Sequence, residues 1–178
     1  MSRYRRVRLP GATWFFTVNL ARRDVAWLTE HIDILRDATR RVRAAHPFAI
    51  DAMVVLPEHL HAVWTLPAGD SDYALRWRLI KSAFSRAIPA GERRNASRIA
   101  KGERGIWQRR FWEHWVRDED DLRRHIEYVH YNPVKHGHVT RAAAWPWSTF
   151  HRYVKAGRLA LDWGVGPGDA AVEFGERA

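Results

Sequence analysis

The chain of 178 residues contains no cysteine, which excludes disulfides, zinc–thiolate sites and thiol catalysis. It also lacks any apolar run close to the about 20 residues that a membrane helix needs. Residues 1–6 (Met-Ser-Arg-Tyr-Arg-Arg) lead into no apolar segment of the kind found in secretory signals. We therefore expect a cytoplasmic protein with no membrane partner.

Acidic residues are scarce relative to basic ones. The chain has 20 Asp and Glu against 30 Lys and Arg, which gives a net charge of +10 and a pI near 10.7. Most of the basic residues are Arg, which binds phosphate through two parallel hydrogen bonds and stacks on bases. A genome with biased base composition would also raise the Arg and Ala content. The charge favours a nucleic-acid partner and a place at the nucleoid.

The expected elements form one α+β domain. Hydrophobic residues make up 46% of the chain, enough for a core of its own. Apolar residues alternate in the expected strands and recur at helical spacing in the expected helices. In chain order we expect strand 13–20, helix 29–45, strands 48–56 and 59–66, helix 71–87, strand 106–116 and a helix that starts after residue 118.

This order is that of a ferredoxin-like split βαβ fold. We expect a four-stranded antiparallel sheet with two helices on one face and the third helix across the other. The domain would span residues 1–143 and carry a Trp/Pro-rich tail, residues 144–178. Residues 89–105 are polar and basic, and form either a solvated linker or a flap that contacts phosphate.

Two histidines flank one leucine at the start of the strand 59–66. Successive side chains of a strand point to opposite faces, so His59 and His61 share a face and Leu60 takes the other. Their Cα atoms would lie about 6.6 Å apart, a separation at which two imidazoles can converge on one ion. The pattern also occurs in strands without a metal, so it needs a second cluster to support it.

That cluster is Tyr128 with Asn132, one turn apart on the third expected helix and beside its apolar stripe. The Asn132 amide oxygen could be a third metal ligand, with the Tyr128 hydroxyl next to the ion. The residue before proline avoids the α region, so Pro133 predicts a kink or a helix end at this point. If the helix ends there, Tyr128 is a half-buried packing residue instead.

Together these residues predict phosphodiester chemistry. A tyrosine is a poor nucleophile alone, but it can attack a phosphodiester that a metal polarises and orients. The product is a covalent phosphotyrosine and a free hydroxyl on the other DNA end. Imidazoles accept many transition metals, so availability would select the ion, and we expect Mg²⁺ or Mn²⁺.

Several segments resemble a known family. Residues 57–64 (Pro-Glu-His-Leu-His-Ala-Val-Trp) resemble the His-hydrophobe-His motif of the single-tyrosine HUH endonuclease superfamily, and residues 128–135 (Tyr-Val-His-Tyr-Asn-Pro-Val-Lys) resemble its nucleophile helix. Residues 11–19, 106–114 and 145–151 extend the resemblance to REP-associated tyrosine transposases. The resemblance covers roughly residues 4 to 163. The chain departs from the family pattern in its long basic loop, residues 89–105.

The resemblance implies a role for each matching residue. It makes His59 and His61 metal ligands, Asn132 the third ligand and Tyr128 the nucleophile. It further implies cleavage and rejoining of single-stranded DNA at REP hairpins, with the 5′-phosphate transferred to the tyrosine. It implies no obligate protein partner, and it favours a monomer.

Other polar residues have a less specific pattern. Tyr131 is a rival nucleophile, but it should point away from the apolar stripe. Glu58 either orients a histidine or water, or is a turn residue. Four further histidines are expected on the helix surface or on DNA: His125, His130, His136 and His138. Phosphate contacts are expected from Arg3, Arg5, Arg6, Arg8, Arg78, Lys81, Arg109 and Arg110.

Two other functions fit parts of the pattern. A non-catalytic RNA-recognition module shares the βαββαβ order, but the chain has no matching aromatic segment on central strands, and the His pair would have no purpose. A metal-dependent phosphoesterase without a covalent step would need carboxylate ligands, for which the core strands offer only Asp51 and Glu58.

Overall fold

The computed structural model describes residues 7–90, 92, 94 and 96–165. Arg3, Arg5 and Arg6 lie outside these residues. The core of the fold is a four-stranded antiparallel sheet in the order β2-β3-β1-β4. Its strands are β1 (Thr13–Asn19), β2 (Ala49–Val55), β3 (His59–Thr65) and β4 (Trp112–Trp115).

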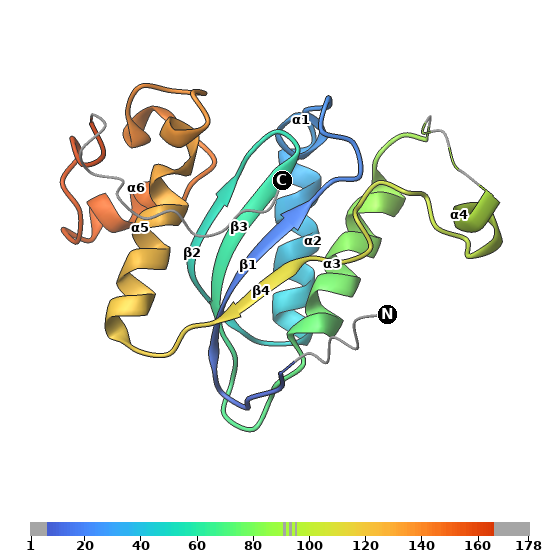
Figure 1. Cartoon of the computed structure of the whole chain (residues 1–178), viewed down its shortest axis with the longest axis horizontal. Coiled ribbons are helices and arrows are strands. Elements are labelled where there is room, and N and C mark those ends of the chain that lie inside the picture. The colour runs from blue at the N-terminus through green and yellow to red at the C-terminus, as the bar shows by residue number, and fades with distance from the viewer. Residues whose placement is uncertain (1–6, 91, 93, 95, 166–178) are drawn as a thin grey trace.

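The helices divide between the two faces of the sheet (Figure 1). Helices α2 (Ile32–Ala45) and α3 (Tyr73–Ala87) pack on one face, over a core that includes Leu60, Trp64 and Trp77. Helix α5 (Glu119–Lys135) crosses the other face and packs against β2 and β3. The α+β split βαβ arrangement predicted from the sequence is confirmed.

Local sequence explains where the main helices start. The Asp118 carboxylate accepts the backbone N–H of Asp121 and so caps α5, and Glu119 and Asp120 lie in the positive first turn. In the same way, Asp72 caps α3 by accepting the N–H of Leu75. These caps fix the residues at which the two helices begin.

The helix predicted at 29–45 is two helices. A short α1 (Trp27–Glu30) precedes α2, and His31 between them has φ −115 and ψ 35, outside the helical region. The basic loop 89–105 is also more regular than expected, because it contains the short helix α4 (Ala96–Ala100).

The strand predicted at 106–116 is shorter, because only β4 pairs continuously with β1. Trp107 forms an isolated bridge to Leu20, and residues 109–111 leave the ladder before β4 begins. The alternating aromatic residues that suggested one long strand therefore belong to a bridge and a short edge strand.

Helix α5 does not end before Pro133. It runs on to Lys135, and the N–H of His136 donates to the Asn132 carbonyl. Proline in a helix removes one hydrogen bond, and here that loss falls in the last turn, where few helical bonds follow. Tyr128 and Asn132 are therefore on one continuous helix.

The segment after residue 144 covers the outer edge of the sheet. The Val55 N–H donates to the Trp147 carbonyl, and the Thr149 N–H donates to the Met53 carbonyl. A 3-10 turn (Ala142–Ala144) and the helix α6 (Phe150–Lys155) flank this contact, so part of the Trp/Pro-rich tail is helical. Within the described residues, every helix is too short or too polar to cross a membrane.

Candidate active site

The two histidines of β3 face α5. His59 and His61 share that face, and Leu60 lies in the opposite core, as the strand alternation predicted. Their ring centroids are 5.0 Å apart, and the exposed fractions are 5% and 0%. The pair is therefore buried on a rigid strand.

One nitrogen of each histidine is held by a neighbouring side chain. The Glu58 Oε1 lies 2.8 Å from His59 Nδ1, and the Thr17 Oγ1 lies 2.9 Å from His61 Nδ1. Burial raises the pKa of Glu58, but the hydrogen bond and charge of His59 outweigh it and leave that pKa below its usual value. Metal-binding histidines commonly make such a contact through the nitrogen that does not bind the ion. Glu58 thus orients His59, the first of the two roles considered for it.

Helix α5 places Tyr128 beside this pair. The Tyr128 ring lies 5.3 Å from the His61 ring, and Phe15 contacts both rings, at 5.8 and 5.6 Å. Tyr128 is 5% exposed. One turn later, Asn132 is fully buried on the same helix. The structure therefore brings His59, His61 and Tyr128 together, with Asn132 buried one turn after Tyr128 on the helix that faces β3.

The donor set suits a divalent metal ion. Both amide atoms of Asn132 are buried without a hydrogen-bond partner among the described residues. A buried, unsatisfied amide costs free energy unless a ligand completes it. An amide oxygen with two imidazoles, each held at Nδ1, is a ligand set that Mn²⁺ accepts, and that Mg²⁺ would accept with added water and phosphate oxygens.

Two further residues lie near the site: Lys135, which was not singled out from the sequence, and His136, which was expected only on the helix surface or on DNA. The Lys135 ammonium lies 4.8 Å from the Tyr128 ring centre and donates to the Tyr128 hydroxyl at 3.3 Å. The His136 ring lies 5.0 Å from that of His59. Lys135 is two turns after Tyr128 on one helix, so its spacing is a signal that could have identified it.

The rival tyrosine lies elsewhere. Tyr131 contacts Trp163, with ring centroids 6.4 Å apart, and its ring also lies against Gly164. It is half-buried under the C-terminal segment instead of pointing to solvent. The geometry favours Tyr128 as the residue next to the His pair.

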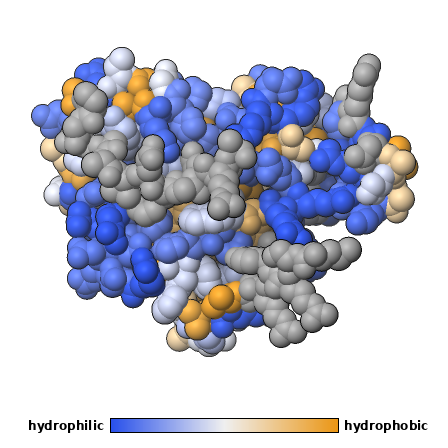
Figure 2. Space-filling view, viewed as in Figure 1, coloured by the Kyte–Doolittle hydropathy of each residue, from blue (hydrophilic) through white to orange (hydrophobic). Residues whose placement is uncertain are grey.

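The described basic candidates gather at a different surface. Arg8, Arg78, Lys81 and Arg109 line a groove of about 730 Å³ between α3 and the segment before β4. In Figure 2, which has the same view as Figure 1, much of the surface is hydrophilic. The Lys81 ammonium donates to the Gln108 carbonyl at 2.6 Å, so it ties α3 to that segment. Arg110 is exposed.

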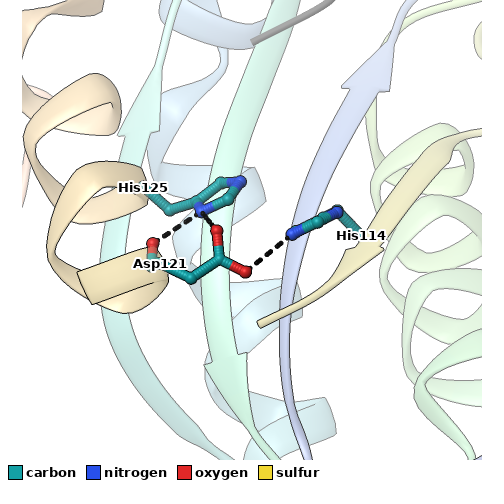
Figure 3. Close-up of side chains that lie close together, drawn as sticks. All are labelled: His114, Asp121 and His125. Carbon is teal, nitrogen blue, oxygen red and sulfur yellow. Dashed lines mark hydrogen bonds and ion pairs between the residues drawn. The ribbon is translucent and has the colours of Figure 1, made fainter. Parts of the chain in front are cut away.

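A second polar cluster joins β4 to the start of α5 (Figure 3). It consists of His114, Asp121 and His125, whose possible ligand atoms lie within 4.8 Å of one another. The Asp121 carboxylate accepts from His114 Nε2 at 3.0 Å and from the backbone N–H and Nε of Arg117, both at 3.2 Å. With so many donors on one carboxylate, the cluster is a hydrogen-bonded clamp.

Electrostatics agree with this clamp. Burial raises the pKa of Asp121, but the hydrogen bonds from His114 and Arg117 bring it down to about 2. Burial lowers the pKa of His125. The expectation that His125 and His130 lie on the helix surface is wrong, because both are fully buried, whereas His136 and His138 are exposed.

No family model matches the chain. A REP-associated tyrosine transposase of Escherichia coli (strain K12) is 48% identical over 163 residues, 92% of this chain and 91% of that protein. A Haemophilus influenzae protein of the same family name is 44% identical over 168 residues, 94% of this chain and 96% of that one.

The chain belongs to the REP-associated tyrosine transposases. The resemblance predicted from the sequence is thereby confirmed, and the chain is an enzyme of this family. A solved structure of a REP-associated tyrosine transposase bound to a REP hairpin is 47% identical, with a TM-score of 0.84. The match covers 100% of this chain and 99% of that one, so the transposase fold accounts for the whole chain.

Proposed function

We infer that this transposase cleaves and rejoins single-stranded DNA beside a REP-type hairpin, with Mg²⁺ or Mn²⁺, through a covalent 5′-phosphotyrosine on Tyr128. One observation carries the inference. The Tyr128 ring lies 5.3 Å from the His61 ring, and on the same helix Asn132 presents a buried amide without a partner among the described residues. This arrangement supports the proposal of a nucleophile next to a metal ion.

Support for the substrate comes from the relatives and from charge. The relatives are named for REP sequences, and the solved relative is bound to a REP hairpin. The net charge of +10 favours a polyanion, because each phosphate contact releases counterions from DNA. We expect the protein to act on DNA at the nucleoid as a monomer and without an obligate protein partner.

The protein's own side chains would prepare the reaction. His59, His61 and Asn132 would hold the metal, while Glu58 and Thr17 fix the two imidazoles through their Nδ1 atoms. A divalent ion at this position supplies Lewis-acid polarisation of a non-bridging phosphate oxygen. Phe15 packs against both His61 and Tyr128, so the nucleophile keeps a defined distance from the ligands.

The covalent step exchanges one ester for another. The Tyr128 hydroxyl gives up its proton to solvent, and a bond forms between its oxygen and phosphorus as the bond from phosphorus to the 3′ oxygen breaks. The 3′ oxygen takes up a proton and leaves as a free hydroxyl. Because the phosphotyrosine keeps the ester, a 3′ hydroxyl can attack it later and rejoin the strand without ATP.

Lys135 would stabilise the phenolate oxygen of Tyr128 both in cleavage and in rejoining. Its ammonium donates to the Tyr128 hydroxyl and lies over the ring. A cation at that oxygen favours the charge that the oxygen carries before attack and again when it leaves during rejoining. Lys135 is at the exposed end of α5, where incoming DNA can also reach it.

The first experiment seeks the covalent intermediate. Incubation with Mn²⁺ and a 3′-labelled REP hairpin that carries a single-stranded flank should give a labelled adduct that survives denaturation, because the tyrosine keeps the fragment that carries the 5′-phosphate. A 5′-labelled hairpin should instead release a free labelled fragment. Tyr128→Phe should abolish the adduct and keep hairpin affinity within about twofold, because it removes one hydroxyl from a buried ring. Tyr131→Phe is the matched control and should keep the adduct.

The alternative functions are outcomes of the same assay. Cleavage without any adduct would favour the phosphoesterase, and binding without cleavage in any metal would favour the RNA-recognition-like module. An adduct that survives Tyr128→Phe would overturn the assignment of the nucleophile.

A further inference from the structure

Trp112 is an exposed aromatic residue on the same face of the sheet as the candidate active site. It lies on the edge strand β4 and is 44% exposed. Thr17 of β1 pairs with Trp112 on one side and with His61 on the other. The Cα atoms of Trp112 and His61 are therefore two strand spacings apart, about 10 Å.

Phe15 links the exposed indole to the reacting groups. Its ring contacts Trp112 at 5.6 Å, His61 at 5.6 Å and Tyr128 at 5.8 Å. Trp112 is thus separated by a single ring from both a candidate metal ligand and the candidate nucleophile. About one or two nucleotides of an extended single strand can cover that distance.

The clamp of Figure 3 fixes the orientation of this surface. His114 stacks nearly parallel to Trp112, with ring centroids 5.9 Å apart and an angle of 10°. Its other neighbours are Asp121, which binds its Nε2, and the His125 ring, 4.7 Å away at 20°. Trp112 is therefore the outermost member of a supported row of rings, and an oriented ring loses little freedom when a ligand stacks on it.

We propose that Trp112 stacks an unpaired base of the single-stranded flank, within about two nucleotides of the phosphodiester that Tyr128 attacks. The proposal rests on the proposed function, because that function supplies the single strand and the reacting phosphate. The proposal also gives a role to the clamp of His114, Asp121 and His125, which holds the His114 ring against Trp112.

Positive charge just before β4 favours DNA as the ligand that stacks on Trp112. Arg109 and Arg110 are exposed and lie immediately before Phe111 and Trp112. Arg109 also lines the basic groove, so phosphates could follow a continuous path from the groove around the β4 edge to Trp112. Every base has a π-face, which suits a flank read by stacking more than by hydrogen bonds.

A protein partner fits this surface less well. The exposed large hydrophobic side chains in the described part of the chain are scattered: Val7, Ile99, Trp112, Trp115, Leu161 and Val165. Trp115 lies on the opposite face, since it pairs with Trp14 of the α2/α3 core. A lone indole is too small for a stable protein interface, which buries about 800 Å² on each partner.

The test uses Trp115 as a matched control, because it is on the same strand with the same exposed fraction of 44%. Hairpins with a single abasic position, moved one nucleotide at a time through the flank, probe each base in turn. Trp112→Ala should weaken flank-dependent binding and adduct formation about tenfold or more, and Trp112→Phe should restore much of the loss. Trp115→Ala should change both by less than about twofold.

The abasic scan decides the proposal. At one position near the cleaved bond, removing the base should weaken the wild type as much as Trp112→Ala does, and should not weaken the Trp112→Ala variant further. Equal losses for Trp112→Ala and Trp115→Ala, or additive losses at every position, would overturn the stacking role. If wild-type protein forms no adduct on any hairpin, the proposed function fails instead.

Discussion

At the scale of single residues, the element that carries a histidine decides whether its burial can be predicted from the sequence. His59 and His61 could be selected from the sequence because strand alternation places them on one face with a leucine between them. Buried His125 and His130 could not be assigned in the same way, since helical spacing alone does not tell how deeply a helix packs. The two side chains that contact the rings of His59 and His61 also differ in how far the sequence could identify them. Glu58 is adjacent in sequence, whereas Thr17 is brought by strand pairing.

Glu58 gives a prediction at this scale. Glu58→Gln keeps the shape but removes the negative charge that holds His59 Nδ1, and should weaken metal affinity about 10-fold to 100-fold. Calorimetric titration with Mn²⁺ measures this directly. Glu127→Gln, on α5 and paired with the exposed Arg123, is the control and should leave the affinity unchanged. Unchanged affinity in Glu58→Gln would show that Glu58 does not support a metal ligand.

At the scale of elements, the sequence was most informative where patterns are long. The strands of the hairpin and the helices α3 and α5 could be predicted because strand alternation and helical spacing run through them. The break at His31 and the short β4 could not, because tertiary contacts decide them. The helix end considered at Pro133 is wrong for a physical reason: proline disfavours a helix, but near the last turn its cost is small enough for packing to overcome.

The contact of α5 with the tail predicts a pH dependence of stability. Burial lowers the pKa of His130 to about 3, and the nearby charges of Arg152 and His151 add to this. Its Nε2 contacts Thr149, which also bonds Met53 of β2. Between the ordinary pKa of 6.5 and the folded value, the unfolded chain binds a proton here that the folded chain does not. Stability should therefore fall as the pH falls through this window, by up to about 1.4 kcal/mol per pH unit.

Denaturant unfolding at several pH values from 7 to 5 tests this contribution. His130→Asn keeps a donor for Thr149 but removes the titrating ring, so it should be less stable than wild type at pH 7 and lose less stability on acidification. The same slope in both proteins would assign the acid sensitivity to other groups.

At the scale of the whole molecule, reaction and charge are separated in space. The candidate active site lies under α5, and the basic groove lies along α3, with the edge strand β4 between them. The fold and its two-sided packing could be predicted from element order, but the groove could not. It depends on how the segment before β4 returns along α3, and no sequence period encodes that path.

The groove predicts the salt dependence of hairpin binding. If Arg78 contacts a phosphate, Arg78→Ala should reduce the slope of log affinity against log salt concentration by about 0.9 for duplex. Arg40→Ala, exposed on α2 and paired with Asp37, is the control and should leave the slope unchanged. Anisotropy titrations from low to moderate salt give both slopes. Equal slopes in the two variants would show that the duplex stem of the hairpin does not contact Arg78.

The central claim is that Tyr128 carries the DNA, and identification of the modified residue tests it most directly. Trypsin cleavage after Arg124 and Lys135 releases residues 125–135, which hold both Tyr128 and Tyr131. Fragmentation of this peptide from the purified adduct, after nuclease digestion, should place a 5′-linked nucleotide on Tyr128. A nucleotide on Tyr131, or on any other peptide, would contradict the account.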